Sequence, residues 1–352
     1  MAKRSVATGC GLVAVLLVAA IVIAFASRER IMLAFFDRAV ARAMTPEPYS
    51  RDGLHILFCG TGSPLPGGNR GEACTAVIAN GQLFVFDAGE GAGRSLSRMA
   101  APLGRAQAVF LTHLHSDHIN GLGNLALQRW VGSTAAAPLP LLGPTGTAEV
   151  GTALNAAYRL DAGYRTAHHG EKVAPPSGAG FAARDIEPGV VYDAGGVRIT
   201  AFAVRHDPVT PAFGYRLDWD GRSVTISGDT AATPALAKAA TGTDILVAEL
   251  LNPALVRRLE SAAKAAGQPA RAKIFADIID YHITPAEAGQ AAHQARARQL
   301  VFTHIVPAVP GFMEAMLVKG AAAEFSGPVK VAADGDVITI AADRTITRTS
   351  RF

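Results

Sequence analysis

The sequence is poor in cysteine, with only three in 352 residues. They stand at positions 10, 59 and 74, too few and too scattered for a disulfide framework or for a zinc knuckle built from thiolates. Cys59 and Cys74 either meet across neighbouring strands or serve separately as small core residues. A small fold held together mainly by disulfides is therefore excluded. With 49% hydrophobic content, the chain can instead bury a large core.

The main part of the chain also lacks an excess of charge of either sign. The whole sequence has 33 Lys and Arg against 29 Asp and Glu, a formal charge of +4. Residues 1–51 hold seven of the basic and three of the acidic side chains, which leaves residues 52–352 with 26 of each. Nucleic-acid-binding domains usually carry a basic face, so this balance argues against nucleic acid as a partner.

One stretch lacks charge altogether, the 21 residues from Val6 to Ala26. As a helix it would be about 31 Å long, enough to cross the hydrocarbon core of a bilayer. We therefore predict an N-terminal transmembrane anchor over residues 1–27. The alternative is a cleaved signal peptide, because Ala24-Phe25-Ala26 fits a small-x-small cleavage site.

The flanking charges bear on which side of the membrane the folded domain occupies. Lys3 and Arg4 before the segment predict a membrane-anchored protein with an extracytoplasmic domain, or a secreted one after cleavage. The arginines that follow the segment favour the opposite orientation. Residues 28–50 are predicted to form an amphipathic helix and a linker, broken at Thr45-Pro46-Glu47-Pro48, and residues 51–352 one folded domain.

Four side chains that can bind a metal fall within six positions of one loop, at His113, His115, Asp117 and His118. The uncharged run Ala108–Leu111 before them is typical of a buried strand, so the loop begins at the edge of a sheet. His113 and His115, two residues apart, point the same way and can share one ion. Asp117 and His118 follow a turn, which indicates a second ion beside the first. Zinc accepts imidazole and carboxylate ligands together.

Three later strands also end near a side chain that can bind a metal. The predicted strands Val197–Val204, Ser223–Ser227 and Leu300–Thr303 are followed by His206, Asp229 and His304, respectively. Because strand ends can converge on one edge of a sheet, we expect these three side chains to join the loop.

The pattern His113-x-His115-x-Asp117-His118 resembles the signature loop of the metallo-β-lactamase superfamily. Asp87-Ala88-Gly89-Glu90-Gly91 is similar to a segment of its ribonuclease Z and arylsulfatase-like branch. The resemblance covers roughly residues 54–340 and implies an α/β fold, a single αββα sandwich, here preceded by the transmembrane helix. It also implies that Asp87 orients a ligand histidine by hydrogen bonding. Alternatively, Asp87 only stabilises the turn.

By this resemblance the protein is a metal-dependent hydrolase with two zinc ions per chain and a metal-bound hydroxide as nucleophile. The predicted ligands are His113, His115 and His206 for the first ion and Asp117, His118 and His304 for the second, with Asp229 bridging. Asp117 can also hold the nucleophile.

Two further residues are predicted to handle protons. Tyr281-His282-Ile283-Thr284 resembles the family's His-x-Thr box, and Glu249 matches its partner, although Ala248 stands where the family has another histidine. The resemblance implies that His282 is the general acid for the leaving oxygen and that Glu249 orients it. Alternatively, His282 only precedes a capped helix that begins at Thr284.

The predicted substrate depends on a missing element. Ribonuclease Z enzymes carry a long tRNA-gripping arm between the positions of His206 and Asp229, and here only 23 residues separate these two. Together with the neutral domain, this predicts a hydrolase of small sulfate or phosphate esters, of arylsulfatase-like or phosphodiesterase type. The alternatives are a ribonuclease Z-type tRNA 3′ endonuclease and a non-catalytic, membrane-tethered binding module. The oligomeric state stays open, a homodimer included.

Two predictions concern the rest of the chain. A helix is expected over about residues 148–160, with His168 and His169 in a loop-like region after it. Near the C-terminus, Val329–Ala332 and Val337–Ile340 are expected to form a hairpin around an Asp-Gly turn.

Overall fold

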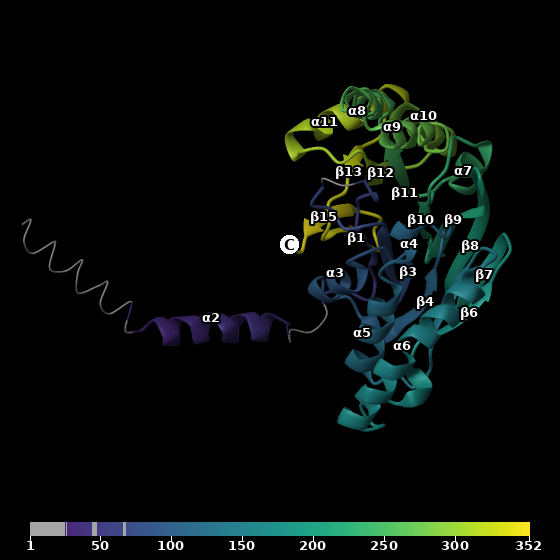
Figure 1. Cartoon of the computed structure of the whole chain (residues 1–352). Coiled ribbons are helices and arrows are strands. Elements are labelled where there is room, and N and C mark those ends of the chain that lie inside the picture. The colour runs from purple at the N-terminus through teal and green to yellow at the C-terminus, as the bar shows by residue number, and fades with distance from the viewer. Residues whose placement is uncertain (1–24, 26, 44–47, 66–67) are drawn as a thin grey trace, which may run out of the picture. The chain divides into compact units, whose positions relative to one another are not determined.

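A computed structural model describes residues 25, 27–43, 48–65 and 68–352 of the chain (Figure 1). The chain divides into two units, Met1–Glu47 and Pro48–Phe352. The first unit contributes helix α2 (Arg28–Ala43), whose large apolar side chains, Phe35 and Phe36 among them, are exposed. All other described elements belong to the second unit.

The transmembrane helix in the predicted fold is contradicted. Among the helices in the described ranges, none is long and apolar enough to cross a bilayer. Apart from Phe25, the run Val6–Ala26 on which the prediction was based lies outside the described residues. The uncharged run alone did not justify the prediction of a transmembrane helix. A spanning helix requires a long apolar segment, but such a segment does not by itself establish one.

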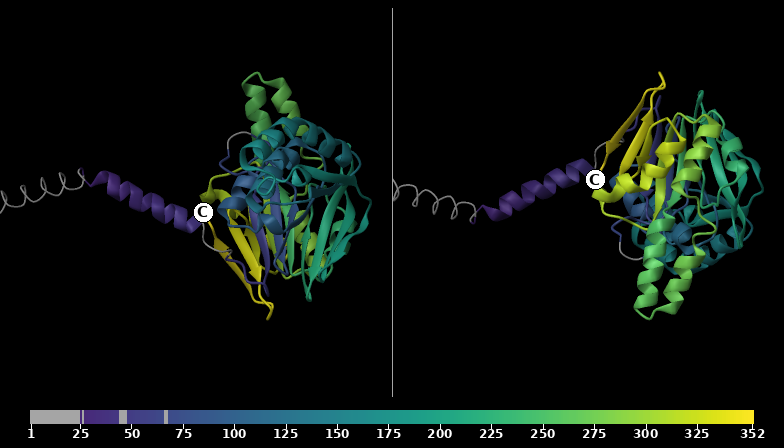
Figure 2. Two further views of the ribbon diagram at one scale, coloured as in Figure 1. Left: turned by 90° about the horizontal axis from the view of Figure 1, so that it is seen from below. Right: turned by 90° about the horizontal axis from the view of Figure 1, so that it is seen from above.

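Two β-sheets form the centre of the second unit (Figure 2). The strands of the first sheet are β1 (Leu54–Gly60), β2 (Cys74–Ala79), β3 (Gln82–Phe86), β4 (Ala106–Phe110), β5 (Leu139–Gly143), β6 (Phe181–Asp185), β14 (Asp336–Ile340) and β15 (Ile346–Ser350). Those of the second are β7 (Gly189–Ala194), β8 (Val197–His206), β9 (Val209–Trp219), β10 (Arg222–Ile226), β11 (Ile245–Leu251), β12 (Gln299–Val306) and β13 (Val329–Val331). Their orders are β15-β14-β1-β2-β3-β4-β5-β6 and β13-β12-β11-β10-β9-β8-β7.

Helices cover the outer face of each sheet. The first sheet is associated with α3 (Ala92–Arg98), α4 (Ser116–Ile119), α5 (Leu122–Ser133) and α6 (Thr147–His169). The second is associated with α7 (Pro234–Ala239), α10 (Pro285–Ala295) and α11 (Glu314–Glu324), whereas α8 (Pro253–Ala265) and α9 (Pro269–Asp277) pack against each other. Short 3₁₀ turns lie at Leu103–Arg105, Pro176–Gly178 and Gly311–Met313. The predicted αββα sandwich is confirmed.

Strand β1 shows why the sheets stack in this way. Leu54, Ile56 and Phe58 belong to the core between the two sheets, whereas Leu57 and Cys59 belong to the core beneath the helices of the first sheet. Successive residues of a strand point to opposite faces, and here both faces are apolar and buried. A strand of this pattern requires cover on both sides, which the second sheet and the helices provide.

The predicted C-terminal hairpin is wrong. β13 pairs in parallel with β12 of the second sheet, whereas β14 lies antiparallel between β1 and β15 of the first. The intervening residues therefore cross from one sheet to the other. Asp-Gly turns favour hairpins only when the flanking strands can pair with each other, and here each has a longer partner elsewhere.

The end of α6 differs from the sequence prediction, and the structure decides between the two arrangements predicted for the cysteines. α6 continues to His169 before Gly170 (φ 77°) ends it, so His168 and His169 lie in the last helical turn and not in a loop. Of the two arrangements open for the cysteines, the structure has the disulfide, which joins Cys59 of β1 to Cys74 of β2 with a Cα–Cα distance of 5.0 Å.

Candidate metal centre

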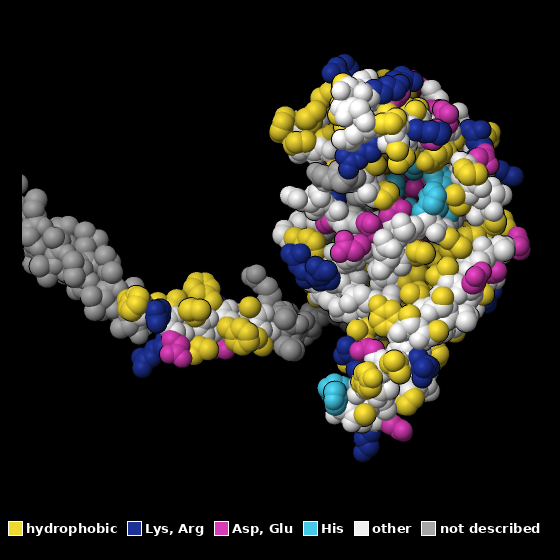
Figure 3. All heavy atoms as spheres, viewed as in Figure 1, with side chains coloured by type: hydrophobic (Ala, Val, Ile, Leu, Met, Phe, Trp, Pro, Cys, Tyr) yellow, Lys and Arg dark blue, Asp and Glu magenta, His cyan; other side chains and the backbone are white. Residues whose placement is uncertain are grey.

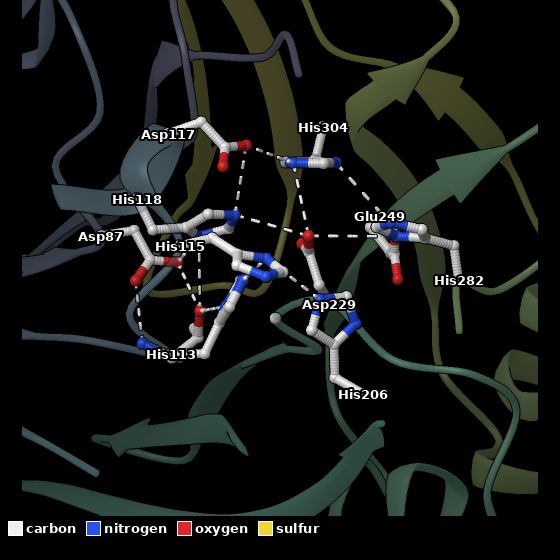
Figure 4. A network of polar contacts seen from close by, with 12 residues as sticks. Asp87, His113, His115, Asp117, His118, His206, Asp229, Glu249, His282 and His304 are labelled. Atoms are coloured by element: carbon white, nitrogen blue, oxygen red, sulfur yellow. Dashed lines mark hydrogen bonds and ion pairs between the residues drawn. The ribbon is translucent and has the colours of Figure 1, made fainter. Parts of the chain in front are cut away.

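The histidine-rich loop begins where β4 ends and is fastened there by Asp87. This residue follows β3 in a left-handed conformation (φ 58°) and accepts hydrogen bonds from the N–H and the hydroxyl of Thr112, both 2.8 Å long. Its Oδ2 also lies 2.8 Å from Nδ1 of His118. Asp87 thus fixes both the start of the loop and the orientation of one of its imidazoles (Figure 4).

A first group of ligand atoms is formed by His113, His115 and His206, which lie within 4.8 Å of one another. Nε2 of His113 is 2.9 Å from Nδ1 of His115, and Nε2 of His206 is 3.4 Å from the same atom. Nδ1 of His206, at the end of β8, donates to the carbonyl oxygen of Tyr281 at 3.0 Å. That bond leaves Nε2 of His206 free to face the other two imidazoles.

A second group adjoins the first and contains Asp117, His118 and His304. Oδ2 of Asp117 is 3.1 Å from Nε2 of His304 and 3.6 Å from Nε2 of His118. Oδ2 of Asp229, which follows β10, is 3.4 Å from each of the same two nitrogens. Asp229 also groups with His113 and so touches both sets.

The donor atoms of this cluster fit a metal centre. Nε2 of His118, which faces the carboxylates of Asp117 and Asp229, is buried and makes no hydrogen bond. Such atoms are rare in folded proteins unless an unseen partner satisfies them. Nitrogen and oxygen donors without thiolates are a set that divalent zinc accepts.

The electrostatics of the cluster also fit a bound cation. Burial lowers the pKa of His304, but the carboxylates of Asp229 and Asp117 outweigh it and raise that pKa to about 9. His118 behaves alike: burial lowers its pKa, yet Asp229 and Asp87 bring it well above the usual value. The buried carboxylates therefore require positive charge beside them, which is what a bound cation would supply.

We predict that Asp87→Asn weakens metal binding about 10- to 100-fold, because the amide no longer accepts both bonds that orient the loop and His118. The measurement is metal content after dialysis against a graded series of chelator concentrations. Asp193→Asn, at an exposed position of β7, is the matched control. Equal metal affinity of the Asp87 variant and the wild type would contradict the orienting role.

A buried pair stands beside the second group. Nδ1 of His282 forms a short contact with Oε2 of Glu249, and Oε1 of Glu249 accepts the N–H of Thr230 at 2.5 Å. Burial lowers the pKa of His282, but the Glu249 carboxylate outweighs it, so the net shift is upward. Thr284 and Glu287 also form the capping box of α10, so both sequence readings of this segment describe real contacts.

The two ligand groups open into a cleft of about 240 Å³. Its walls include His115, Asp117 and His282 from the centre, and Ile274, Ile278 and Tyr281 from α9 and the turn after it. Figure 3 shows histidine side chains at the surface of this hollow. A substrate can therefore reach the ligand groups from solvent.

The structure brings together all nine predicted site residues, which are His113, His115, Asp117, His118, His206, Asp229, Glu249, His282 and His304 (Figure 4). Sequence reasoning missed the contributions of Thr112 and of the Tyr281 carbonyl. Thr112 lies directly before the loop, a signal that was available; a backbone oxygen carries no signal in the sequence. The helices α8 and α9 were also missed.

Comparison with known proteins identifies the family. Residues 83–305 match the model of the β-lactamase superfamily domain. Ribonuclease Z from Mycobacterium bovis (strain BCG / Pasteur 1173P2) is 38% identical over 283 residues, 80% of this chain and 96% of that protein. Ribonuclease Z from Mycobacterium tuberculosis (strain H37Rv) is 37% identical with the same coverage.

Solved structures share the fold. The metallo-β-lactamase fold protein YhfI from Bacillus subtilis matches with a TM-score of 0.58 and 22% identity, over 82% of this chain and all of that one. Human tRNase Z, short form, matches with a TM-score of 0.56 and 23% identity, over 81% of this chain and 98% of that one.

These relatives correct the predicted substrate. Hydrolysis of small sulfate or phosphate esters, the arylsulfatase-like reading and the exclusion of nucleic acid are all contradicted, because the similar proteins are ribonuclease Z enzymes. Since 96% of such a relative aligns with this chain, the missing arm does not separate the chain from enzymes of that name.

The predicted membrane-anchored or secreted location is contradicted as well. It depended on the transmembrane helix, and no described helix could span a membrane. The ribonuclease Z relatives offer it no support. The matched family model, the shared αββα sandwich and the identity to curated relatives agree on one conclusion: the chain belongs to the β-lactamase superfamily of metallohydrolases, within its ribonuclease Z branch.

Proposed function

We propose that this protein is a ribonuclease Z-type endonuclease that hydrolyses a phosphodiester bond on the 3′ side of tRNA precursors. The observation that carries the proposal is the 38% identity to a ribonuclease Z over 96% of that enzyme's length. The adjoining ligand groups at the floor of one cleft support it. The fold alone would not select RNA, because one fold hosts many activities.

We assign two zinc ions to the centre. His113, His115 and His206 would hold one, Asp117, His118 and His304 would hold the other, and Asp229 would contribute to both. When bound, such ions lower the pKa of water and polarise a phosphoryl oxygen. The buried carboxylates and the Nε2 atom of His118, which makes no hydrogen bond, support the assignment.

The residues of the chain supply the proton transfers. Asp117 faces the cleft and accepts a hydrogen bond from the attacking water, which orients the oxygen toward phosphorus. As the phosphorus–oxygen bond to the ribose breaks, the 3′ oxygen leaves with the bonding electrons and takes a proton from His282. Glu249, on Nδ1 of His282, keeps the ring oriented and stabilises its protonated form.

We predict that the zinc-loaded full-length protein cleaves a tRNA precursor carrying a 3′ trailer and leaves a 3′ hydroxyl on the tRNA. Chelator should abolish cleavage and added zinc should restore it, because the ligand groups release their ions. An aryl sulfate and an aryl phosphodiester, assayed in parallel, report activity on small esters. Turnover of a small ester by a metal-loaded protein that leaves the RNA intact would refute the proposal.

A further inference from the structure

α8 and α9 form a helical hairpin, residues 253–277, inserted between Glu249 and His282. It begins four residues after Glu249 and ends five residues before His282. Its buried side chains are few and small, Val256, Ala263 and Ala272. Both views of Figure 2 show the pair projecting from the body of the sandwich. A projecting element at the rim of a cleft is placed to contact a substrate larger than the cleft.

The hairpin is locally basic although the domain is neutral. Its 25 residues contain five basic and two acidic side chains, so residues 52–352 without it carry a formal charge of −3. All five basic side chains are exposed: Arg257, Arg258, Lys264, Arg271 and Lys273. The two lysines pair with Glu260 and Asp277. Averaging over the whole domain therefore hides a concentration of positive charge beside the cleft.

Three of these cations have no acidic partner. Within the described ranges, Arg257 and Arg258 form no ion pair, and Arg271 contacts only the side-chain oxygen of Gln268, at 3.1 Å. An exposed guanidinium that is not paired with a carboxylate has N–H groups available to donate to a phosphate. In Figure 3, Lys and Arg side chains gather over α8, α9 and α10, above the histidines of the cleft.

The geometry of α9 connects this charge to the cleft. Ile274 and Ile278 line the cleft, and Arg271 lies three and seven residues before them, on the same helix face. At 1.5 Å per residue, Arg271 stands about 10 Å along that face from Ile278, toward the tip of the hairpin. The rim thus continues from apolar side chains at the cleft to a cation farther out.

On the basis of the proposed function, we propose that the α8–α9 hairpin is an RNA-backbone-binding element, in which Arg257, Arg258 and Arg271 contact phosphates of the tRNA precursor outside the cleft. It supplies the phosphate contacts for which the short segment between His206 and Asp229 leaves no room. Its charge acts on any RNA sequence, because phosphate contacts position a substrate and do not read bases.

The test uses the full-length, zinc-loaded triple variant Arg257→Gln/Arg258→Gln/Arg271→Gln. Glutamine keeps helix propensity and removes charge. The matched control is Arg159→Gln/Lys172→Gln/Arg184→Gln, three exposed cations on or next to α6 and β6, at the opposite end of the domain (Figure 1). We measure the Kd for the tRNA precursor at several salt concentrations, together with zinc content, melting temperature and turnover of an aryl phosphodiester.

The hairpin variant should bind the precursor at least about tenfold more weakly, and its log Kd should depend on log salt with a slope smaller by about 2 to 3. The control should bind as the wild type does. If the hairpin variant binds the precursor with wild-type affinity and salt dependence, the inference is overturned. That result is expected if the hairpin instead binds a protein, and it leaves the proposed RNA cleavage unaffected. Equal losses on RNA and on the small ester also overturn it, since the defect then lies in the metal centre. A wild type that neither binds nor cleaves the precursor refutes the proposed function itself.

Discussion

Replacing Asp229 with alanine is expected to abolish hydrolysis and metal retention together. Its Oδ2 lies 3.4 Å from ligand nitrogens of both His118 and His304, and it also groups with His113. Without this carboxylate, the two ligand groups lose an oxygen donor that lies near both, and the imidazoles lose an anion that balances their charge. We expect turnover to fall at least about 1,000-fold, which corresponds to roughly 4 kcal/mol in the activation barrier.

The measurement combines turnover of the tRNA precursor with zinc content by mass spectrometry after gel filtration. Asp193→Ala, an exposed carboxylate paired with Arg198, is the matched control and should behave as the wild type. Near-ultraviolet circular dichroism establishes that the fold is retained. An Asp229 variant that keeps its zinc and its activity would rule out the bridging role.

Replacing His282 with alanine is expected to spare zinc binding and to slow hydrolysis about 100- to 10,000-fold. The loss should be greatest for substrates with poor leaving groups, because these depend most on a proton delivered to the departing oxygen. Glu249→Gln should give a smaller loss in the same direction, since the ring remains but its orienting carboxylate is gone. The two residues act as a unit, so the double variant should be little slower than His282→Ala alone.

The control for this series is His293→Ala, an exposed histidine on α10. Rates are compared across aryl phosphodiesters whose leaving groups span a range of pKa values, with zinc content measured alongside. A loss of zinc would make His282 a metal ligand, since its nitrogen also lies near Asp229 and His304. An equal slowing of every ester would remove it as the proton donor.

The cluster itself could be anticipated from the sequence because each of its members lies near the end of a strand. His113 to His118 come after β4, and Asp229 comes three residues after β10. His206 is the last residue of β8, whereas His304 lies within β12, two residues before that strand ends. Periodicity locates such strand ends without knowledge of the pairing. Pairing itself was not predictable near the C-terminus, where β13 and β14 belong to different sheets. Local turn chemistry favours a hairpin there, and only the long-range partners β12 and β1 decide otherwise.

The substrate was misjudged for a different reason. A net charge is a sum over the domain, and the formal neutrality of residues 52–352 contains a hairpin with five basic side chains. Whether those charges gather at the cleft depends on where α8 and α9 stand, and the sequence does not give that placement. The extension of α6 to His169 was missed because alanine and polar residues alternate there without an apolar stripe.

The ligands of the metal centre come from both sheets, and 191 residues separate His113 from His304. One edge of β1, in the first sheet, is covered only when β14, which is synthesised much later, pairs with it. A chain still being synthesised has the histidine-rich loop long before it has β12, so it holds only part of the donor set. The complete donor set therefore forms only after the two sheets have assembled. We therefore expect an unfinished or truncated chain, which lacks part of the donor set, to show no hydrolase activity.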